Sequence, residues 1–255
     1  MGKLENKVAV VTGAASGMGR AISVMYAQEG AKVVLADYNL EGAEEAAKEI
    51  IAAGGTALAV KADVADSNDI AAMIDTAISE YGSLDILVNN AGIMDSFEPV
   101  GEVTDEKWEH IFDVNTKGVM RAMRKAVNYW LENDKKGNII NVISTGGLNG
   151  AHAGVAYAAS KHAVVALTKN TAFMYAQKNI RVNGIAPGAV ATNISSGMTS
   201  VSELGMSRAR LAHGVIPATG TSEDIGAVAV FLGSDDTGFV NGAIIVADGG
   251  WTAAF

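Results

Sequence analysis

The sequence predicts an α/β protein with a single domain, a Rossmann-like, doubly wound parallel β-sheet flanked by helices. Short runs of β-branched and aliphatic residues alternate with longer segments of helical periodicity. The strand runs are continuously apolar, which is typical of a parallel sheet covered on both faces. At 255 residues and 49% hydrophobic content the chain can bury one large core, and no linker or repeat divides it.

The elements follow one another as strand, helix and strand from the N-terminus. Three strand and helix pairs come first, and three further strands, each bounded by Gly or Asn, precede a closing strand. This succession of units favours a parallel sheet. The expected strands are Lys7–Val11, Lys32–Ala36, Ala57–Lys61, Leu84–Val88, Asn138–Ile143, Ile180–Ile185 and Ala243–Val246, and the expected helices are Arg20–Glu29, Glu41–Ala53, Asp69–Tyr81 and Val155–Tyr175.

The alternation of strand and helix patterns is interrupted between residues 189 and 220. Irregular connections of this length often carry function, so we expect a substrate-binding lid at about 189–220 within a domain that spans 1–255. An ordinary surface loop is the alternative. Methionine is also common in hydrophobic cores, so the methionines of the segment do not by themselves indicate a ligand site. The glycines and methionines of this segment are Gly197, Gly205, Gly214, Met198 and Met206.

Composition excludes several classes of function. The chain has no cysteine, which rules out disulfides, thiolate zinc sites and a cysteine nucleophile. Its formal net charge of −9 would repel a polyphosphate backbone, so we expect no nucleic-acid partner. No apolar run in the sequence reaches the roughly 18 residues of a membrane span or forms a signal peptide. We therefore expect no membrane association and a cytoplasmic location.

The four histidines show no metal-ligand spacing. They form no close helical pair and have no neighbouring carboxylate motif. We expect no metal site and structural or surface histidines, with His152 set apart by its place near the candidate site described below. The others are His110, His162 and His213.

The first expected strand runs into a glycine-rich turn, Thr12–Gly19, after which a helix begins. Glycines let the backbone approach a pyrophosphate closely, and a helix N-terminus offers unpaired N–H groups and the positive end of a dipole. The spacing of Gly13, Gly17 and Gly19 differs from the G-x-G-x-x-G fingerprint. A plain glycine turn is therefore the alternative for this motif taken alone.

Asp37 ends the second expected strand, at the separation from the glycine turn where a carboxylate binds the adenine ribose of a dinucleotide. Its charge would reject a 2′-phosphate, and neither Ser16 nor Tyr38 supplies a cation to attract one. The pattern predicts NAD(H) rather than NADP(H) as cofactor. A solvated carboxylate at a strand end is the alternative.

Tyr157 and Lys161 stand four residues apart in a helical run, so their side chains leave the same face of the expected helix. A neighbouring ammonium and a cationic nicotinamide would both favour the phenolate of a side chain whose ordinary pKa is about 10. Tyr157 is therefore a candidate for proton exchange with a substrate, and an exposed helical pair is the alternative. Ser144 lies in a Gly-rich turn upstream, from which its hydroxyl would reach the same site.

Together these features resemble the short-chain dehydrogenase/reductase family over nearly the whole chain. The resemblance implies an enzyme that transfers a hydride between nicotinamide and a carbonyl or secondary alcohol. The matching motifs are Thr12–Gly19, Asp63-Val64, Asn89-Asn90-Ala91-Gly92, Asn115, Ser144, Tyr157-x-x-x-Lys161, Pro187-Gly188 with Thr192, Asn241-Gly242 and Asp248-Gly249-Gly250.

The resemblance also implies roles for four catalytic residues. Tyr157 would be the general acid/base, and Lys161 would lower its pKa and hold the nicotinamide ribose. Ser144 would bind the substrate oxygen, and Asn115 would steady a water that leads protons to Lys161.

The cofactor contacts are carried over by position in the same way. The glycine turn would hold the phosphates, Asp37 and Asn90 would bind riboses, and Thr192 would bind the carboxamide. The expected cofactor-binding residues are Gly13, Ser16, Gly17, Met18, Gly19, Asp37, Asp63, Val64, Asn90, Ala91, Gly92, Tyr157, Lys161, Pro187, Gly188, Val190 and Thr192.

The expected substrate pocket is largely apolar. A small or medium hydrophobic ketone, diketone or cyclic alcohol fits such a pocket, and a sugar such as glucose, as in a glucose 1-dehydrogenase, stays open. By analogy with the family, the pocket is formed by Met94, Ser144, Gly146, Leu148, His152, Met198 and Met206.

Three other functions agree with parts of the pattern. A 3-oxoacyl-[acyl-carrier-protein] reductase shares the catalytic residues but usually uses NADPH, which Asp37 and Ser16 disfavour. A serine hydrolase needs a G-x-S-x-G elbow, which is lacking around Ser144. A non-catalytic NAD-binding sensor would lack a catalytic residue, and none is missing.

The resemblance further implies a homotetramer with two-fold symmetry. Small residues on the helix that carries Tyr157 would permit close contact between helices, and the apolar tail Trp251–Phe255 could lie against a neighbour. The small residues are Ala156, Ala159, Ala163 and Ala166.

Overall fold

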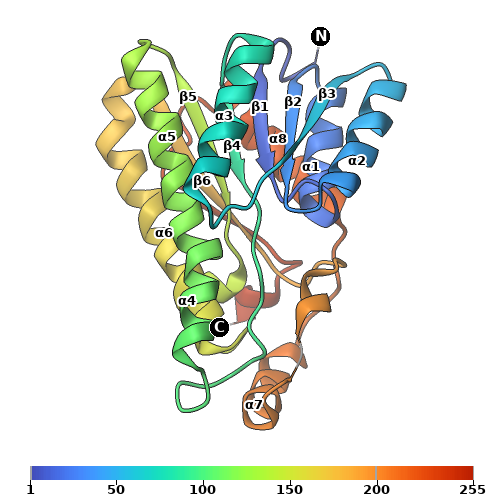
Figure 1. Cartoon of the computed structure of the whole chain (residues 1–255). Coiled ribbons are helices and arrows are strands. Elements are labelled where there is room, and N and C mark those ends of the chain that lie inside the picture. Colours follow the sequence, from blue (N-terminus) through green and yellow to red (C-terminus); the bar gives the residue numbers. More distant parts are fainter. Residues whose placement is uncertain (1, 199, 255) are drawn as a thin grey trace.

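The computed structural model describes residues 2–198 and 200–254. Its centre is a seven-stranded sheet in the order β3-β2-β1-β4-β5-β6-β7 (Figure 1). All neighbouring strands pair in parallel; Val10, for example, lies opposite Val34 on one side and Leu87 on the other. The expected Rossmann-like fold class is confirmed. The strands are β1 (Val8–Thr12), β2 (Lys32–Asp37), β3 (Thr56–Lys61), β4 (Ile86–Asn89), β5 (Gly137–Val142), β6 (Ile180–Pro187) and β7 (Ile244–Ala247).

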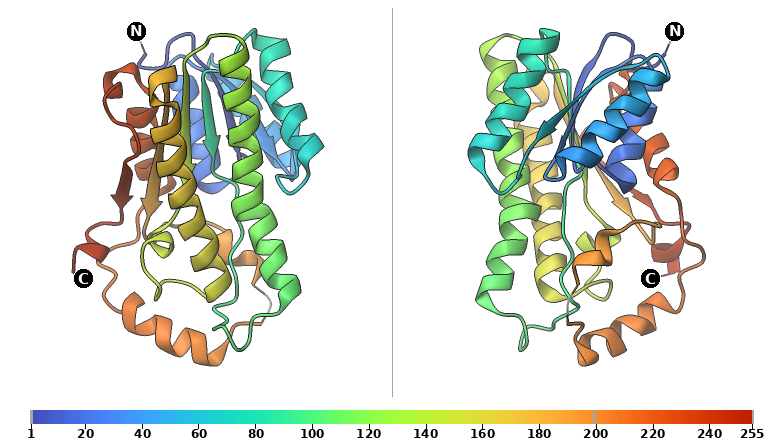
Figure 2. Two further views of the ribbon diagram at one scale, coloured as in Figure 1. Left: turned by 90° about the vertical axis from the view of Figure 1, so that its left-hand side faces the viewer. Right: turned by 45° about the vertical axis from the view of Figure 1, so that its right-hand side comes forward.

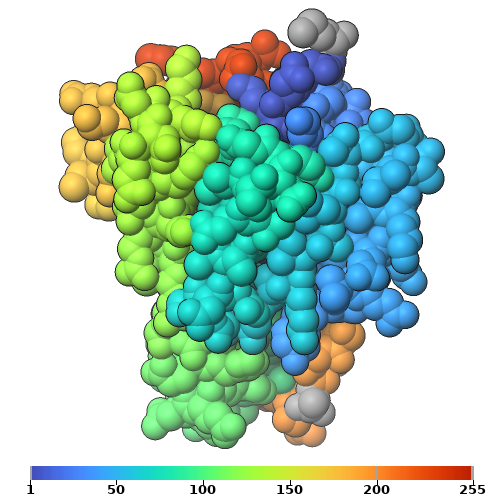
Figure 3. All heavy atoms as spheres, turned by 45° about the horizontal axis from the view of Figure 1, so that its top comes forward, coloured from blue at the N-terminus to red at the C-terminus, as the bar shows by residue number. Residues whose placement is uncertain are grey.

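Helices cover both faces of the sheet, which explains why the strands are apolar without alternation. One core lies between the sheet and α1, α2 and α8, and a second lies between the sheet and α3, α5 and α6. In the space-filling view, α3 and α5 form one continuous surface over this second face (Figure 3). These helices are α1 (Gly17–Gln28), α2 (Leu40–Ala52), α3 (Ser67–Tyr81), α5 (Val119–Glu132), α6 (Val155–Tyr175) and α8 (Ser222–Gly233).

The large side chains of these helices are fully enclosed. Trp130 of α5 is completely buried, and its indole Nε1 donates to the carbonyl of Leu84 at 2.7 Å, at the amino end of β4. Tyr26 of α1 is also buried and donates to the carbonyl of Ala229 in α8 at 2.9 Å. The Trp130 Nε1 and the Tyr26 hydroxyl thus both have partners, so burial of these two aromatic rings carries no desolvation penalty for an unpaired group.

The strand order reverses between β1 and β4, because the chain winds outward to β3 first and then crosses to the other side. In doubly wound sheets the ligand lies outside the carboxyl ends of the strands at this point. Below this edge lie α4 (Asp105–Phe112) and α7 (Glu203–His213) (Figures 1 and 2). The segment expected to be a lid therefore contains a helix, and it lies below the carboxyl edge.

The beginning of the first helix differs from the expected one for a physical reason. Helix α1 begins at Gly17 rather than Arg20, because Gly17 and Gly19 contribute no apolar periodicity although they take helical positions. A Cβ on Gly19 would lie 2.0 Å from the carbonyl oxygen of Gly13, so the packing of the turn against the helix requires glycine.

Candidate active site

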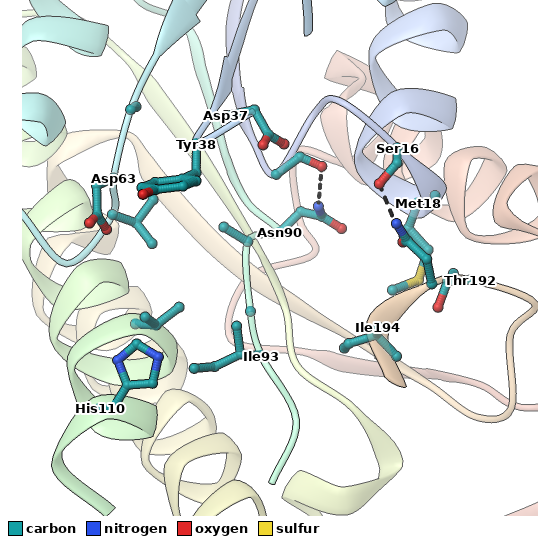
Figure 4. A pocket seen from close by; sticks show the side chains of 18 residues that line it. Ser16, Met18, Asp37, Tyr38, Asp63, Asn90, Ile93, His110, Thr192 and Ile194 are labelled. Atoms are coloured by element: carbon teal, nitrogen blue, oxygen red, sulfur yellow. Dashed lines mark hydrogen bonds between the residues drawn. The ribbon is translucent and has the colours of Figure 1, made fainter. Parts of the chain in front are cut away.

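A cavity of about 530 Å³ lies at the carboxyl ends of β1, β2 and β4, with the start of the lid segment on its other side (Figure 4). Most of the residues expected to bind the cofactor line it. These are Gly13, Ser16, Gly17, Met18, Asp37, Asp63, Val64, Asn90, Ala91, Gly92 and Thr192. The site is therefore assembled from segments far apart in the chain.

The glycine turn has the conformation that a phosphate site requires. Gly13 and Gly17 have positive φ angles of 66° and 53°, which disfavour side chains. Ser16 is the N-cap of α1, but its side chain makes no capping hydrogen bond. The first N–H groups of α1 are thus left without a side-chain cap at the wall of the cavity, as an anion site at a helix N-terminus needs.

Asn90 gives a second indication that a dinucleotide fits. Its Nδ2 donates to the carbonyls of Thr12 and Gly13 at 2.9 and 3.1 Å, which fixes the side chain. Its Oδ1 is buried and has no hydrogen-bond partner within the described part of the chain. A buried acceptor without a partner is costly. A ribose hydroxyl in the cavity would supply the missing donor.

The carboxylates at the far end of the cavity are held by backbone groups. Asp37 accepts hydrogen bonds from the N–H of Ala15 at 2.9 Å and of Asn39 at 2.8 Å. Each carboxylate oxygen keeps a second lone pair for a ribose hydroxyl. Among the described residues that line the cavity there is no lysine or arginine. The nearest cation identified beside this end is Lys61, whose Nζ lies 5.8 Å from the ring centroid of Tyr38.

The expected catalytic residues converge at the beginning of α6. Tyr157 and Lys161 are 5% and 3% exposed, and the Lys161 Nζ lies 5.6 Å from the centroid of the Tyr157 ring. The Lys161 Nζ donates to the carbonyl of Val142 at 3.1 Å, at the end of β5. Ser144 lies two residues beyond this strand, and its hydroxyl lies beside the Tyr157 side chain. The geometry thus brings together three of the four expected catalytic residues, and the fourth, Asn115, is described below.

Burial dominates the proton affinities of this pair in the free protein. Burial raises the pKa of Tyr157 to about 12; the hydrogen bond with Ser144 opposes this, and the charge of Asp95 adds to it. Burial lowers the pKa of Lys161 to about 8. The expected lowering of the Tyr157 pKa by Lys161 and by a cationic nicotinamide therefore remains a prediction for the enzyme with bound cofactor.

Asn115 lies in a π-helical turn, Asp113–Gly118, between α4 and α5. Such turns are frequent at functional sites because they redirect a side chain. The Asn115 side chain accepts from the N–H of Ile93 and donates to its carbonyl, both at 2.9 Å. Its Nδ2 also lies 3.2 Å from the Ser160 hydroxyl. Asn115 thus joins the segment after β4 to α6, and its expected role with water remains a prediction.

The expected substrate residues are more scattered. A Cβ on Gly146 would lie 3.4 Å from both the Ser144 hydroxyl and the Tyr157 ring, so Gly146 borders the catalytic pair. His152 instead stacks on Trp251, with ring centroids 3.8 Å apart, and lines a second cavity of about 950 Å³ beside α7. Three expected pocket residues, Met94, Met198 and Met206, are half-buried, and Leu148 is exposed. Their part in the substrate site stays a prediction.

Several residues on the wall of the first cavity escaped sequence reasoning. His110 was expected to be structural or on the surface, yet it lines the cavity opposite the glycine turn (Figure 4). The position of Tyr38 directly after Asp37 was the available signal for that residue. The remaining wall residues come from segments that carry no recognisable motif. The residues missed are Tyr38, Ala62, Ile93, His110, Val114, Asn193 and Ile194.

The described residues, 2–198 and 200–254, contain neither a metal cluster nor a membrane-spanning helix. No group of His, Asp or Glu side chains there has the arrangement of a metal site. No helix in those ranges is both long enough and apolar enough to cross a membrane.

Comparison with known proteins agrees with this geometry. Residues 13–252 match the family described as enoyl-(acyl carrier protein) reductase. The chain is 45% identical over 250 residues to 3beta-hydroxysteroid dehydrogenase 2 of Eggerthella lenta, covering 98% of this chain and 96% of the relative. It is 38% identical over 251 residues to cyclohexanol dehydrogenase of an Acinetobacter species, covering 98% and 97%.

A solved structure gives the same result. The crystal structure of levodione reductase superposes with a TM-score of 0.89 at 34% identity, covering 98% of this chain and 99% of that one. The expected family and reaction class are confirmed. With its parallel sheet, its glycine turn and its buried tyrosine and lysine, the chain belongs to the short-chain dehydrogenase/reductase family, whose members interconvert secondary alcohols and ketones.

Proposed function

We propose that this protein is an NAD(H)-dependent dehydrogenase of secondary alcohols carried on an apolar, cyclic frame. The observation that carries the proposal is the buried pair Tyr157 and Lys161, with the half-buried Ser144 beside it, next to the proposed dinucleotide cavity. The cyclic class is suggested by the relatives, since the names of two of them specify a hydroxysteroid and cyclohexanol. A sugar is disfavoured because the expected pocket side chains are mostly apolar.

Nicotinamide, when bound, accepts a hydride from the alcohol carbon or gives one to the ketone. Tyr157 would take up or give the proton at the substrate oxygen through its hydroxyl, since the Tyr157 and Ser144 side chains lie side by side where that oxygen would bind. Ser144 would donate a hydrogen bond to the same oxygen. Lys161 would fix the nicotinamide ribose and, when the cofactor is bound, favour the phenolate. Asn115 would connect Lys161 to solvent through a water.

Different residues of the cavity would bind different parts of the dinucleotide. The glycine turn and the start of α1 would bind the phosphates, since Gly13, Gly17 and Met18 line the cavity and the first turn of α1 has no side-chain cap. Asp37 would bind the adenine ribose, Asp63 and Val64 would border the adenine, and Asn90 would bind a ribose through its free Oδ1. On the lid side, Val190 and Thr192 would hold the carboxamide, and Pro187 and Gly188 just before the lid would also contact the cofactor.

The preference for NAD(H) rests on charge. Asp37 lines the end of the cavity where a 2′-phosphate would lie, and no lysine or arginine stands among the described lining residues. A phosphate placed there would meet a carboxylate in a partly enclosed site, where repulsion is stronger than in water.

Two properties of the whole protein belong to the same proposal. A homotetramer is supported by exposed aromatic side chains near the ends of α6 and α8, with Phe173 82% exposed and Phe239 fully exposed. Ala163 and Ala166 border a shallow groove between α5 and α6 that a second helix pair would fill. We propose a cytoplasmic location and a domain with a substrate lid at 189–220.

The test is an assay of the purified protein with NAD+ or NADP+ and a panel of secondary alcohols. Cyclohexanol, a 3β-hydroxysteroid, a 3α-hydroxysteroid, glucose and a linear secondary alcohol are compared by nicotinamide absorbance. We expect turnover of a cyclic apolar alcohol with NAD+. Activity on glucose alone, or activity with none of the panel despite binding of NADH, would contradict the proposal.

A further inference from the structure

Asp95 is a buried carboxylate that neither the sequence motifs nor the mechanism above assign. It lies in the segment after β4, between the cofactor cavity and the lid, and it is 0% exposed. Burial raises the pKa of its carboxyl group, against which three backbone hydrogen bonds act. A buried carboxylate is rare without a specific reason.

The three donors lie at the beginning of the catalytic helix and in the segment of Asp95 itself. The Oδ1 of Asp95 accepts from the N–H of Gly154 at 2.9 Å and of Phe97 at 3.1 Å. Its Oδ2 accepts from the N–H of Tyr157 at 2.9 Å. The carboxylate therefore binds directly to the backbone of the residue proposed to transfer the proton.

Helix α6 has no cap of its own. Its N-cap residue is Gly154, and the helix therefore has no side-chain capping hydrogen bond. A Cβ on Gly154 would lie 2.5 Å from the Oδ2 of Asp95, so the place of a normal capping side chain is taken by Asp95. The next N–H, of Val155, donates to the carbonyl of Glu98 at 2.9 Å. The segment 95–98 thus caps the first turn of α6 from outside.

The same segment also contacts the lid. The carbonyl of Ser96 accepts from the N–H of Ser202, the N-cap of α7, at 2.9 Å. A Cβ on Gly205 would overlap the carbonyl oxygen of Phe97, at 1.7 Å. Phe97 itself has a φ of 62°, a conformation that residues other than glycine rarely adopt. The strained segment therefore packs against α7 and against α6 at once.

We propose that Asp95 is a positioning residue, which holds the first turn of α6 so that the Tyr157 hydroxyl meets the substrate oxygen, and whose negative charge, held against the Tyr157 backbone, adds to burial in disfavouring the phenolate. This inference rests on the proposed role of Tyr157. The positioning role and the charge effect can be tested separately. In Asp95→Asn the neutral amide preserves part of the hydrogen bonding while it removes the charge.

The charge acts on Tyr157 together with its other neighbours. Lys161 of the same helix carries the opposing charge, and Ser144 after β5 contributes a neutral hydrogen bond. Glu98 adds a second negative charge beside Asp95, and Lys107 of α4 is paired with Glu98. Removal of the Asp95 charge should lower the pKa of Tyr157, because a nearby anion disfavours the phenolate.

The experiment compares Asp95→Asn and Asp95→Ala with matched substitutions of Asp85. Asp85 also accepts a backbone hydrogen bond, from Val8 at 2.8 Å, but it lies at the amino edge of the sheet, away from the site. Each variant is measured for kcat against pH in the direction of alcohol oxidation, for NADH affinity by fluorescence, and for amide hydrogen exchange over 150–160.

In the alcohol-oxidation direction Tyr157 must be deprotonated, so activity rises with pH along an acidic limb. We expect both Asp95 variants to move this limb to lower pH by about 0.5 unit or more. We expect Asp95→Ala to lower kcat by about tenfold or more, because small displacements of reacting groups are costly. Amide protection at 154–158 should fall in Asp95→Ala and much less in Asp95→Asn. The Asp85 variants should leave the position of the acidic limb, kcat and the amide protection at 154–158 unchanged, even where they lower the stability of the protein.

Gly154→Ala supplies a second test that leaves Asp95 in the chain. The added Cβ would push the carboxylate away from the helix, so kcat and amide protection should fall while the acidic limb stays nearer its original pH. If the limb and the amide protection of both Asp95 variants equal those of the wild type, Asp95 does not position Tyr157. Since amide exchange needs no turnover, failure of this inference is distinguishable from failure of the proposed activity.

Discussion

The cofactor side and the substrate side of the carboxyl edge are built differently. On the cofactor side, backbone groups of the glycine turn, Asp37 and Asn90 are fixed by short-range hydrogen bonds to neighbouring strands. On the side proposed to bind the substrate, helix α7 of the proposed lid exposes Leu204 and Leu211 by 56% and 65%. A dinucleotide always presents the same phosphates and riboses, whereas the substrate varies. We therefore expect the cofactor side to recognise its ligand through fixed polar groups, and the proposed substrate side to present an adaptable apolar wall.

The two sides meet at the Tyr157 hydroxyl, so its removal should have the largest effect. Tyr157→Phe keeps the ring and removes the proton donor, and we expect kcat to fall by about a hundred- to ten-thousandfold. NADH affinity should change little, because the phenol is not the main cofactor anchor. The measurements are steady-state kinetics and NADH fluorescence titration. Turnover near that of the wild type would show that proton transfer does not pass through Tyr157.

The next largest effect concerns the cofactor side alone. We expect the wild type to prefer NADH over NADPH by at least about a hundredfold in kcat/KM, about 2.7 kcal/mol. Asp37→Ser should erode this preference, mostly by weakening NADH, because charge-assisted hydrogen bonds to the ribose are lost. Adding Tyr38→Arg should then raise the use of NADPH through a cation for the phosphate.

Lys61 provides the control for this experiment, because it lies beside Tyr38. Lys61→Ala in the Asp37→Ser background tells whether any NADPH use depends on that lysine. Equal use of both cofactors by the wild type, or an unchanged ratio in Asp37→Ser, would show that Asp37 does not select the cofactor.

A smaller effect should appear on the substrate side alone. The indole Nε1 of Trp251 donates to the carbonyl of Ala212, near the end of α7, at 2.9 Å. Trp251→Phe removes this hydrogen bond, whose net worth is about 1 kcal/mol, and should raise the KM for the alcohol about threefold without changing NADH affinity. Trp130→Phe is the matched control, since it removes the equivalent bond to Leu84 at the opposite edge. The same KM change in both variants would mean that Trp251 does not hold the lid.

The smallest effect is a dependence of stability on pH. Burial, together with the nearby His213, lowers the pKa of His152, while Asp248 opposes this. The unfolded chain therefore binds a proton more readily than the folded one, and stability should fall as the pH drops below about 6.5. His152→Phe retains a ring against Trp251, and its Tm should fall less between pH 7.5 and 5.5. An equal fall in both proteins would show that His152 does not contribute.

The features that the sequence predicted correctly are mostly those that local patterns encode. The parallel sheet, the glycine turn, Asp37 and the pair Tyr157 and Lys161 are recognisable because their chemistry depends on residues close together in the chain. The beginning of α1 was misplaced by three residues, Gly17 instead of Arg20, since glycine carries no helical periodicity.

Residues whose role arises from long-range contacts could not be recognised. Asp95 acts on residues 59 and 62 positions further along the chain, and no local pattern marks it. His110 gave no sign that α4 brings it to the cavity wall. The stack of His152 on Trp251 likewise joins the loop before α6 to the last helical turn, Trp251–Ala254. Such contacts are set by the packing of whole elements rather than by spacing within one of them.

Transfer of an isotopic label tests the proposed reaction most directly. Cyclohexanol or a 3β-hydroxysteroid deuterated at the carbinol carbon is incubated with NAD+ and the wild-type protein, and the nicotinamide product is analysed by NMR. Deuterium should appear at C4 of NADH with the wild type and should be nearly absent with Tyr157→Phe at equal NADH affinity. Deuterium released to water, or ketone formed without labelled NADH, would contradict direct hydride transfer at this site.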